Sequence, residues 1–292
     1  MAKFKPQTKD ELKELVNNPE INLGDIDTSL ITDMSKLFLQ TEREKFDGIE
    51  SWDVSNVTDM SNMFAEAESF NQPLEKWNVS NVENMSFMFG CDKFTPDYLL
   101  ESFNQPLNNW DVSNVTDMSN MFGGDYEDMA GAKAFNQPLD SWDVSNVETM
   151  RCMFCGAESF NQPLGSWNVF NVGDMSDMFY GATAFNQPLD SWEVDSVWNM
   201  NGMFCGAESF NQPLADWETE SVENMESMFE EATSFNQPLD SWDVSGVGNM
   251  NGMFRNATSF NQSLESWDIS NVDEMEDMFE GASAYTYGEL EK

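Results

Sequence analysis

A 25-residue period runs through almost the whole chain and limits its fold more strongly than any other feature. Trp52 and Trp77 are 25 residues apart, Trp110 and Trp142 follow at steps of 33 and 32, and the later members return to steps of 25: Trp167, Trp192, Trp217, Trp242 and Trp267. The surrounding text is nearly constant and reads FNQPLxxWDVSNVxxMxxMF. Units this short cannot bury an apolar face alone and are stabilised by stacking on their neighbours. A divergent first copy, with Ile26 at the tryptophan position, brings the total to ten units.

The apolar spacing inside one unit predicts a strand followed by helical turns. Trp77 and Val79 stand two apart among β-favouring residues, so they point to the same side of a short strand. The apolar residues of 82–89 recur at steps of three and four, which favours helical or 3₁₀ turns on the opposite wall, with Asn84 as their cap. We therefore expect a leucine-rich-repeat-like solenoid with one short parallel β-strand per unit and a core of stacked Trp, Val, Met and Phe columns.

The motif LxxWxVSNVTxMxxMF resembles the BspA-like leucine-rich repeats of bacterial surface proteins and mycoplasma lipoproteins. The opening FKPQTKDELKELV, followed by TSLITDMSKLF, is similar to the cap of standalone members from large DNA viruses, protists and bacteria. The resemblance covers nearly the whole chain and implies a repeat fold with a surface, adhesion or interaction role. The chain departs from the secreted members because it has neither a signal peptide nor a lipobox cysteine.

The chain divides into a cap, a repeat array and a tail. Residues 1–24 form the expected N-terminal cap, in which Thr8 to Glu11 is a capping box for a helix from Lys9 to about Val16. Residues 25–281 hold the ten units, with inserted loops near 90–102 and 123–131, and 282–292 form a C-terminal tail. The last unit has no evident cap. We expect this edge either to be shielded by the tail or to stack end to end on another chain.

The charge of the chain excludes several classes of function. Asp and Glu number 53 against 13 Lys and Arg, which gives a formal charge of -40, and histidine is absent. Phosphate backbones and anionic lipid repel such a chain, so we expect no nucleic-acid partner and no membrane insertion. Without histidine the common catalytic triads and most zinc sites are missing, so we expect no enzyme and no cofactor. No signal peptide or long apolar run is present, which predicts a soluble, cytoplasmic chain, although similar proteins are often at the cell surface.

Deviations from the repeat consensus mark the candidate binding residues. Both inserted loops follow the Met-Phe pair, and they carry the aromatic residues Phe94, Tyr98 and Tyr126. Aromatic residues on protruding loops either anchor a partner or pack together as a small cluster, and the sequence favours neither.

A second candidate site lies on the predicted strand face, where acids and aromatics replace consensus residues. Most positions directly after a core tryptophan are acidic, which we read first as a hydrated face that maintains solubility. In two units the usual serines are also lost, and we expect the following residues to gather on one outward face: Phe170, Glu193, Asp195, Trp198, Asp216, Glu218 and Glu220. Exposed aromatics beside carboxylates suit a Lys- or Arg-bearing partner. Carboxylates alone also suit Ca²⁺, although no known calcium-loop spacing is present.

These features favour a non-enzymatic protein-interaction or adhesion scaffold with a basic protein partner. One alternative is an acidic decoy whose carboxylate array imitates a nucleic-acid backbone and captures basic proteins. A Ca²⁺-binding repeat protein is another, and a glycan hydrolase using paired acids is a weaker one.

Overall fold

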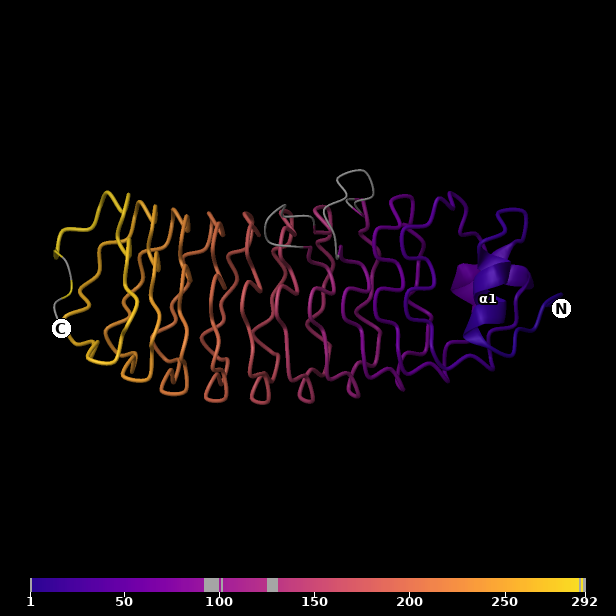
Figure 1. Ribbon diagram of the computed structural model, residues 1–292, viewed down its shortest axis with the longest axis horizontal. Helices are drawn as coiled ribbons and strands as arrows, with labels where there is room; N and C mark the ends of the chain where they lie inside the picture. Colours follow the sequence, from indigo (N-terminus) through magenta and orange to yellow (C-terminus); the bar gives the residue numbers. More distant parts are fainter. Residues whose placement is uncertain (1, 92–99, 101, 125–130, 289, 291–292) are drawn as a thin grey trace.

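The computed structural model describes residues 2–91, 100, 102–124, 131–288 and 290, which form one elongated stack of coils (Figure 1). Helix α1 (Lys9–Val16) lies at the N-terminal end, and the 3₁₀ turns η1 (Leu23–Asp25) and η2 (Ile49–Ser51) follow it. The expected helix is confirmed with its cap, because the Thr8 side chain accepts a hydrogen bond from the Glu11 N–H at 3.3 Å.

Neighbouring coils are joined by one isolated parallel β-bridge each. The bridged residues form a single column: Asp33, Asp59, Asn84, Asp117, Thr149, Asp174, Asn199, Asn224, Asn249 and Glu274. The column has ten members, one in each coil. The expectation of one β-strand per unit is wrong, because the described residues contain no strand and no sheet beyond single bridges. The bridge also lies directly before the first methionine of the unit, outside the Trp-x-Val segment.

The Trp-x-Val segment has the side-chain alternation of a strand but not its hydrogen bonds. Trp77 and Val79 are buried and Asn78 between them is exposed. The backbone closes turns within the unit instead, since the Trp77 N–H donates to the Leu74 carbonyl at 3.0 Å. The link to the preceding coil is made by the indole, whose Nε1 donates to the Ile49 carbonyl at 3.1 Å. The alternation of buried and exposed side chains therefore reflects an extended backbone that forms no backbone hydrogen bonds to a neighbouring strand.

The predicted helical turns are also absent, and a ladder of backbone donors takes their place. In one representative coil the N–H groups of Met175, Asp177, Phe179 and Gly181 donate to carbonyls of the next coil at 2.7 to 3.0 Å. The N–H groups between them close turns within the coil, for example from Met178 to the Met175 carbonyl at 3.3 Å. We call the four bonds that join two coils the donor ladder. Asn84, expected to cap a helix, accepts from the Ser86 N–H at 2.9 Å in a local turn.

This geometry requires a left-handed backbone at two positions in each coil. The φ angle is 56° at Asp177 and 65° at Gly181, and the same two positions are left-handed in most other coils. With a left-handed residue at every fourth position of this segment, every second N–H group faces the next coil, and N–H groups between them close turns within the coil. The prediction of helical turns is wrong because consecutive β-turns place apolar residues at the same three- and four-residue spacing.

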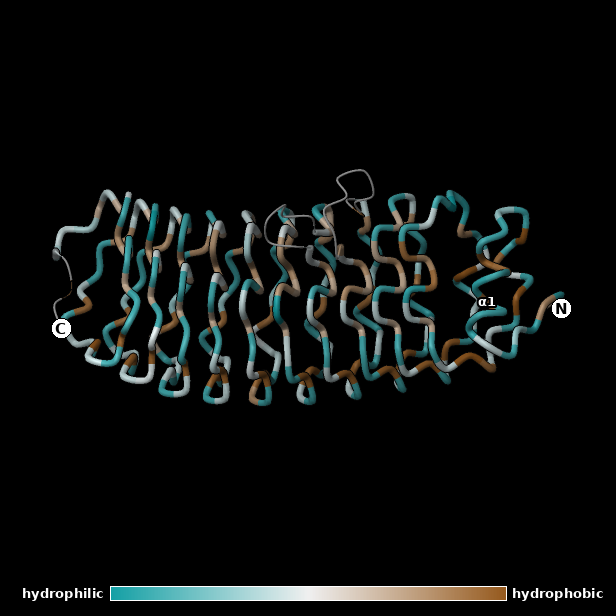
Figure 2. The backbone as a smooth tube through the Cα atoms, in the orientation of Figure 1, coloured by the Kyte–Doolittle hydropathy of each residue, from teal (hydrophilic) through white to brown (hydrophobic). Residues whose placement is uncertain are grey.

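The expected core of stacked columns is confirmed. Every repeat tryptophan, and the Phe residue of each Met-Phe pair before the last coil, is buried. Rings of successive coils lie parallel, as in Trp142 and Trp167, whose centroids are 6.3 Å apart. Within a coil the two phenylalanines stack more closely, at 4.0 Å for Phe179 and Phe185. Figure 2 shows the same alternation of hydrophilic and hydrophobic stretches recurring from coil to coil.

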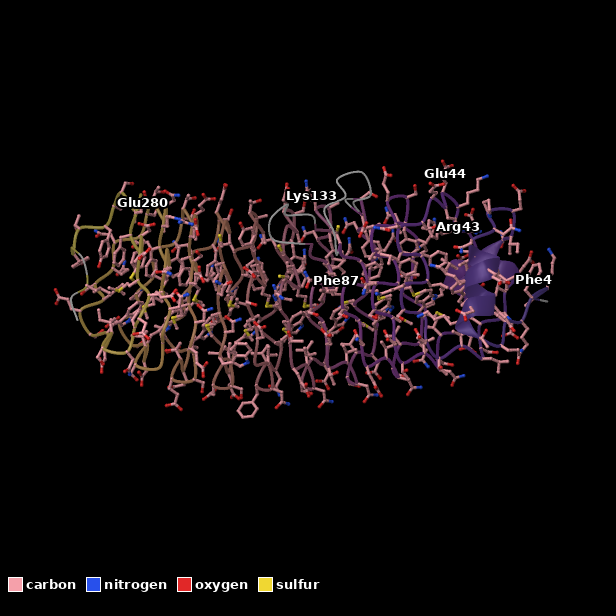
Figure 3. All side chains as sticks on the ribbon, viewed as in Figure 1. Phe4, Arg43, Glu44, Phe87, Lys133 and Glu280 are labelled. Carbon is pink, nitrogen blue, oxygen red and sulfur yellow. The ribbon has the colours of Figure 1, made fainter. Side chains whose placement is uncertain are left out.

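Helix α1 is fixed to the first coil by two cationic side chains. Lys13 Nζ donates to the backbone carbonyls of Lys36 and Leu37 at 2.8 and 2.6 Å. The buried Arg43 guanidinium donates to the Val16 carbonyl at 2.8 Å, at the end of α1, and to the Ile21 carbonyl at 2.5 Å (Figure 3). Both side chains satisfy carbonyl groups at the boundary between the cap and the first coil.

Two tryptophans of opposite environment test this packing. Trp142→Ala removes a buried, stacked indole and should lower the free energy of unfolding by about 3 to 5 kcal/mol. Trp198→Ala is the matched control, because the Trp198 side chain is 48% exposed. Urea unfolding of both variants should show a large loss for the first and a loss within about 0.5 kcal/mol for the second. Equal losses would contradict the assignment of the tryptophan column to the core.

Candidate functional site

The aromatic and acidic residues expected on the strand face are all exposed to solvent. We call this set the aromatic-acidic face: Phe170, Glu193, Asp195, Trp198, Asp216, Glu218 and Glu220. Phe170 and Trp198 are each 48% exposed, whereas the Trp and Phe residues of the repeat columns are buried in the interior coils. Large aromatic side chains at this exposure are not needed by the core and are typical of a binding surface.

In ordinary coils the acid after the core tryptophan has a structural role that the sequence did not reveal. Asp243 accepts from the Ser245 N–H at 2.9 Å and from the Ser245 hydroxyl at 2.6 Å. These hydrogen bonds hold the pKa of the Asp243 carboxyl below its usual value. The same pair recurs at Asp53 with Ser55. The acidic column is therefore largely a column of local turns.

Two coils of the aromatic-acidic face lack this turn. Where the consensus has Asp-x-Ser, they have Glu193 with Asp195 and Glu218 with Glu220. Among the described residues none of these four carboxylates makes a hydrogen bond or an ion pair with another side chain. The substitution exchanges a serine donor for a second acid, so four carboxylates that the fold does not require face the solvent.

An open polar groove lies beside this face, and the sequence analysis did not predict it. Its lining comes from four successive coils: Glu83, Asn114, Thr116, Asn146, Glu148, Asn171 and Gly173. The asparagines bind the preceding coil, since Asn171 Nδ2 donates to the Ser145 carbonyl at 2.7 Å. We call this the asparagine groove. The sequence did contain a signal for the end of the groove. In the two coils after Asn171, the asparagine position is occupied by Ser196 and Ser221.

Trp198 connects the two surfaces. A methyl group built on Gly173 would lie 3.0 Å from Trp198 Nε1 and 3.2 Å from Cδ1, so the indole rests on the Gly173 backbone at the end of the asparagine groove. Phe170 directly precedes the groove residue Asn171. The groove and the aromatic-acidic face therefore form one continuous surface.

The remaining sequence candidates, Phe94, Tyr98 and Tyr126, lie outside the described residues. Within the described part of the chain, no group of three or more Cys, Asp or Glu side chains is placed to hold a metal ion. In that same part, no helix has the length and apolar character needed to cross a membrane.

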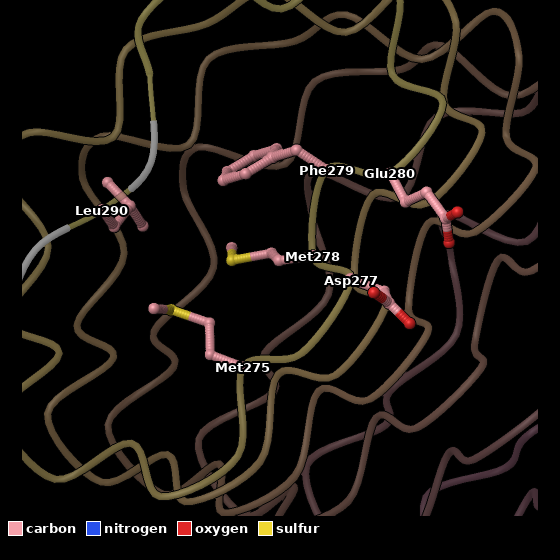
Figure 4. Close-up of a pocket in the computed structure, with 6 residues that line it drawn as sticks. All are labelled: Met275, Asp277, Met278, Phe279, Glu280 and Leu290. Atoms are coloured by element: carbon pink, nitrogen blue, oxygen red, sulfur yellow. The ribbon is translucent and has the colours of Figure 1, made fainter.

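The last coil presents a pocket at the end of the stack, lined by four apolar and two acidic residues. Figure 4 shows Met275, Met278 and Phe279 directed toward Leu290, with Asp277 and Glu280 on the other side. The rings of Tyr285 and Phe279 stack at 3.9 Å, so part of the last coil is covered. End-to-end association through this face stays a prediction.

A buried acid lies beside the CxxC pair that the repeat contains. Asp177 Oδ2 is 3.9 Å from the Cys152 sulfur, and the Cys155 N–H closes a turn on the Cys152 carbonyl at 3.1 Å. Burial raises the pKa of Asp177 to about 6, with the Arg151 charge opposing the rise. The contact with Cys152 and burial hold the pKa of the Cys155 thiol above its usual value. Cys152 and Cys155 are buried repeat residues without a disulfide, and the raised pKa keeps the Cys155 thiol protonated and unreactive.

Comparisons with known proteins place the repeats in one family. The family model described as "Mycoplasma protein of unknown function, DUF285" matches residues 10–127, 97–211 and 187–290. The three overlapping matches follow the repeat array and together cover most of the chain. No curated protein and no solved structure matches the chain.

The Asp177 carboxyl gives a test of this buried environment. Its pKa is higher in the folded chain than in the unfolded one, so the folded state loses stability as pH rises from about 4 to 6. A rise of that size corresponds to about 3 kcal/mol at neutral pH. Asp177→Asn, an isosteric change at a position where other coils have Asn62 and Asn120, should therefore stabilise the protein above pH 6 and have little effect near pH 4.

The matched control is Asp117→Asn, which removes the same charge at a bridge position where Asn84 and Asn199 stand in other coils. Urea midpoints at both pH values should shift for Asp177→Asn only at the higher pH. A variant no more stable than the parent at neutral pH would contradict a costly buried carboxylate.

Proposed function

The chain belongs to the family described as "Mycoplasma protein of unknown function, DUF285", and we propose from the site geometry that it is a non-enzymatic protein-interaction or adhesion scaffold. The family description itself gives no activity. Its partner is a basic protein that docks on the aromatic-acidic face. The finer resemblance of the repeat motif to BspA-like surface proteins agrees with the adhesion part of this proposal.

One observation carries the proposal. Phe170 and Trp198 are half exposed in a chain that buries its other repeat aromatics, and they stand beside four carboxylates without a role in the local turns. An aromatic ring next to an acid attracts a Lys or Arg side chain by both the π face and the charge. The surrounding net charge of -40 adds long-range attraction for a basic partner.

The aromatics should contribute to binding but not to folding. Phe170→Ser restores the consensus residue, and Trp198→Glu introduces the residue found at Glu148 and Glu223 in neighbouring coils. Each variant should unfold within about 0.5 kcal/mol of the parent and lose about 1 kcal/mol or more of binding to a lysine- and arginine-rich probe peptide, measured by calorimetry. If both variants lose stability, the aromatics are structural and the proposed site fails.

Salt separates the aromatic contribution from pure charge. Binding of the probe peptide should weaken steeply as ionic strength rises, because exposed charges are screened over about 8 to 10 Å at physiological salt. A residual affinity that depends on Phe170 and Trp198 should persist at high salt. Complete loss at high salt, with no effect of the two aromatic variants, would favour the acidic decoy over a specific docking surface.

A further inference from the structure

The asparagine groove has a lining rich in hydrogen-bond acceptors. Asn114, Asn146 and Asn171 each hold their Nδ2 atom at 2.7 Å from a serine carbonyl of the preceding coil. The Thr116 hydroxyl donates to the Glu83 carbonyl at 3.3 Å. The amide oxygens and the Glu83 and Glu148 carboxylates are thus the groups available to a ligand, and none of the lining residues is cationic.

The end of the groove brings a carboxylate close to an aromatic face. Glu148, Gly173 and Trp198 occupy the same position in three successive coils. Their backbones are joined by hydrogen bonds of 2.9 Å, from Gly173 to Glu148 and from Trp198 to Gly173. Since Gly173 has no side chain and the indole leans over it, nothing from the middle coil separates Trp198 from the Glu148 coil.

We propose that the asparagine groove binds an arginine side chain in an extended basic segment of the partner. The guanidinium stacks on the Trp198 indole and donates hydrogen bonds to the Glu148 carboxylate and the Asn171 amide oxygen. Guanidinium is planar and carries five donors and no acceptor, which complements a site of acceptors beside an aromatic ring. The inference rests on the proposed function and deepens it by naming the side chain that is recognised.

Other ligands fit this chemistry less well. Each hydroxyl group of a glycan is an acceptor as well as a donor. In a groove that offers mainly acceptors, the acceptor side of those hydroxyls would find few donors. A phosphate is repelled by Glu83 and Glu148. Lysine carries the charge but lacks the planar fork that binds a carboxylate with two parallel bonds, and it stacks less closely on indole.

Three probe peptides test the assignment. They share one flexible glycine- and serine-rich sequence and carry two arginines, two lysines or two citrullines, and their affinity for the full chain is measured by fluorescence anisotropy. We expect the arginine peptide to bind at least fivefold more tightly than the lysine peptide, and the neutral citrulline peptide to show no measurable binding. Equal affinity for arginine and lysine overturns the proposal.

Two variants examine the groove and leave every residue of the aromatic-acidic face unsubstituted, although Gly173→Ala moves the Trp198 ring. Glu148→Gln removes the carboxylate, and Gly173→Ala places a methyl group 3.0 Å from the indole nitrogen, which must then shift away. Each should weaken the arginine peptide at least fivefold. Asp273→Asn is the matched control, since it removes the same charge at the same position of the last coil and should change affinity less than twofold.

The outcomes distinguish the groove from the proposed function. If Phe170→Ser weakens binding but Glu148→Gln and Gly173→Ala do not, the scaffold proposal holds and the arginine site is overturned. If no basic peptide binds the parent chain, both fail. If the two groove variants weaken the arginine peptide and leave the lysine peptide within twofold, the arginine site is supported.

Discussion

The donor ladder is the interaction on which the rest of the molecule depends. In each interior coil four backbone N–H groups bond carbonyls of the next coil, and all four point the same way along the stack. The arrangement costs energy, because non-glycine residues such as Asp177 must adopt a left-handed backbone at roughly 1 to 2 kcal/mol each. The inter-coil bonds and the buried aromatic columns offset that cost, so no coil is stable without its neighbours.

Because the ladder and core fix every coil, the outward positions are free to differ. The Asp-x-Ser turn is replaced at Glu193 and Glu218 without a change in the backbone pattern, and Trp198 takes a position held by glutamate elsewhere. The same rigid framework places Glu148, Gly173 and Trp198 in register. A surface built this way acquires a recognition site by single substitutions and keeps its shape.

The sequence predicted the core and the cap, but not the backbone that joins the coils. Periodic tryptophans identify stacking columns, and Thr8 with Glu11 identifies α1, because both signals are local. Trp77 and Val79 suggested a strand because in-and-out alternation reports an extended chain and says nothing of its hydrogen-bond partners. One signal was present: Gly, Asn and Asp recur at the left-handed positions, as at Asp177, Gly181 and Gly202.

The candidate site could be predicted only in part for a similar reason. Phe170 and Trp198 departed from the consensus and are exposed, as expected. The asparagine groove was missed because its residues belong to the consensus and become a groove only when coils stack.

The common direction of the donor ladder also gives the stack an electric polarity. Peptide dipoles that point the same way in every coil add along the axis, with their negative, carbonyl ends toward α1. The charge distribution matches this field: seven of the 13 basic residues precede position 46, and Lys13 touches the exposed carbonyls directly. The cationic cap thus acts as a counter-charge to a dipole opposite in sense to that of an α-helix, and each added coil would lengthen the dipole that the cap neutralises.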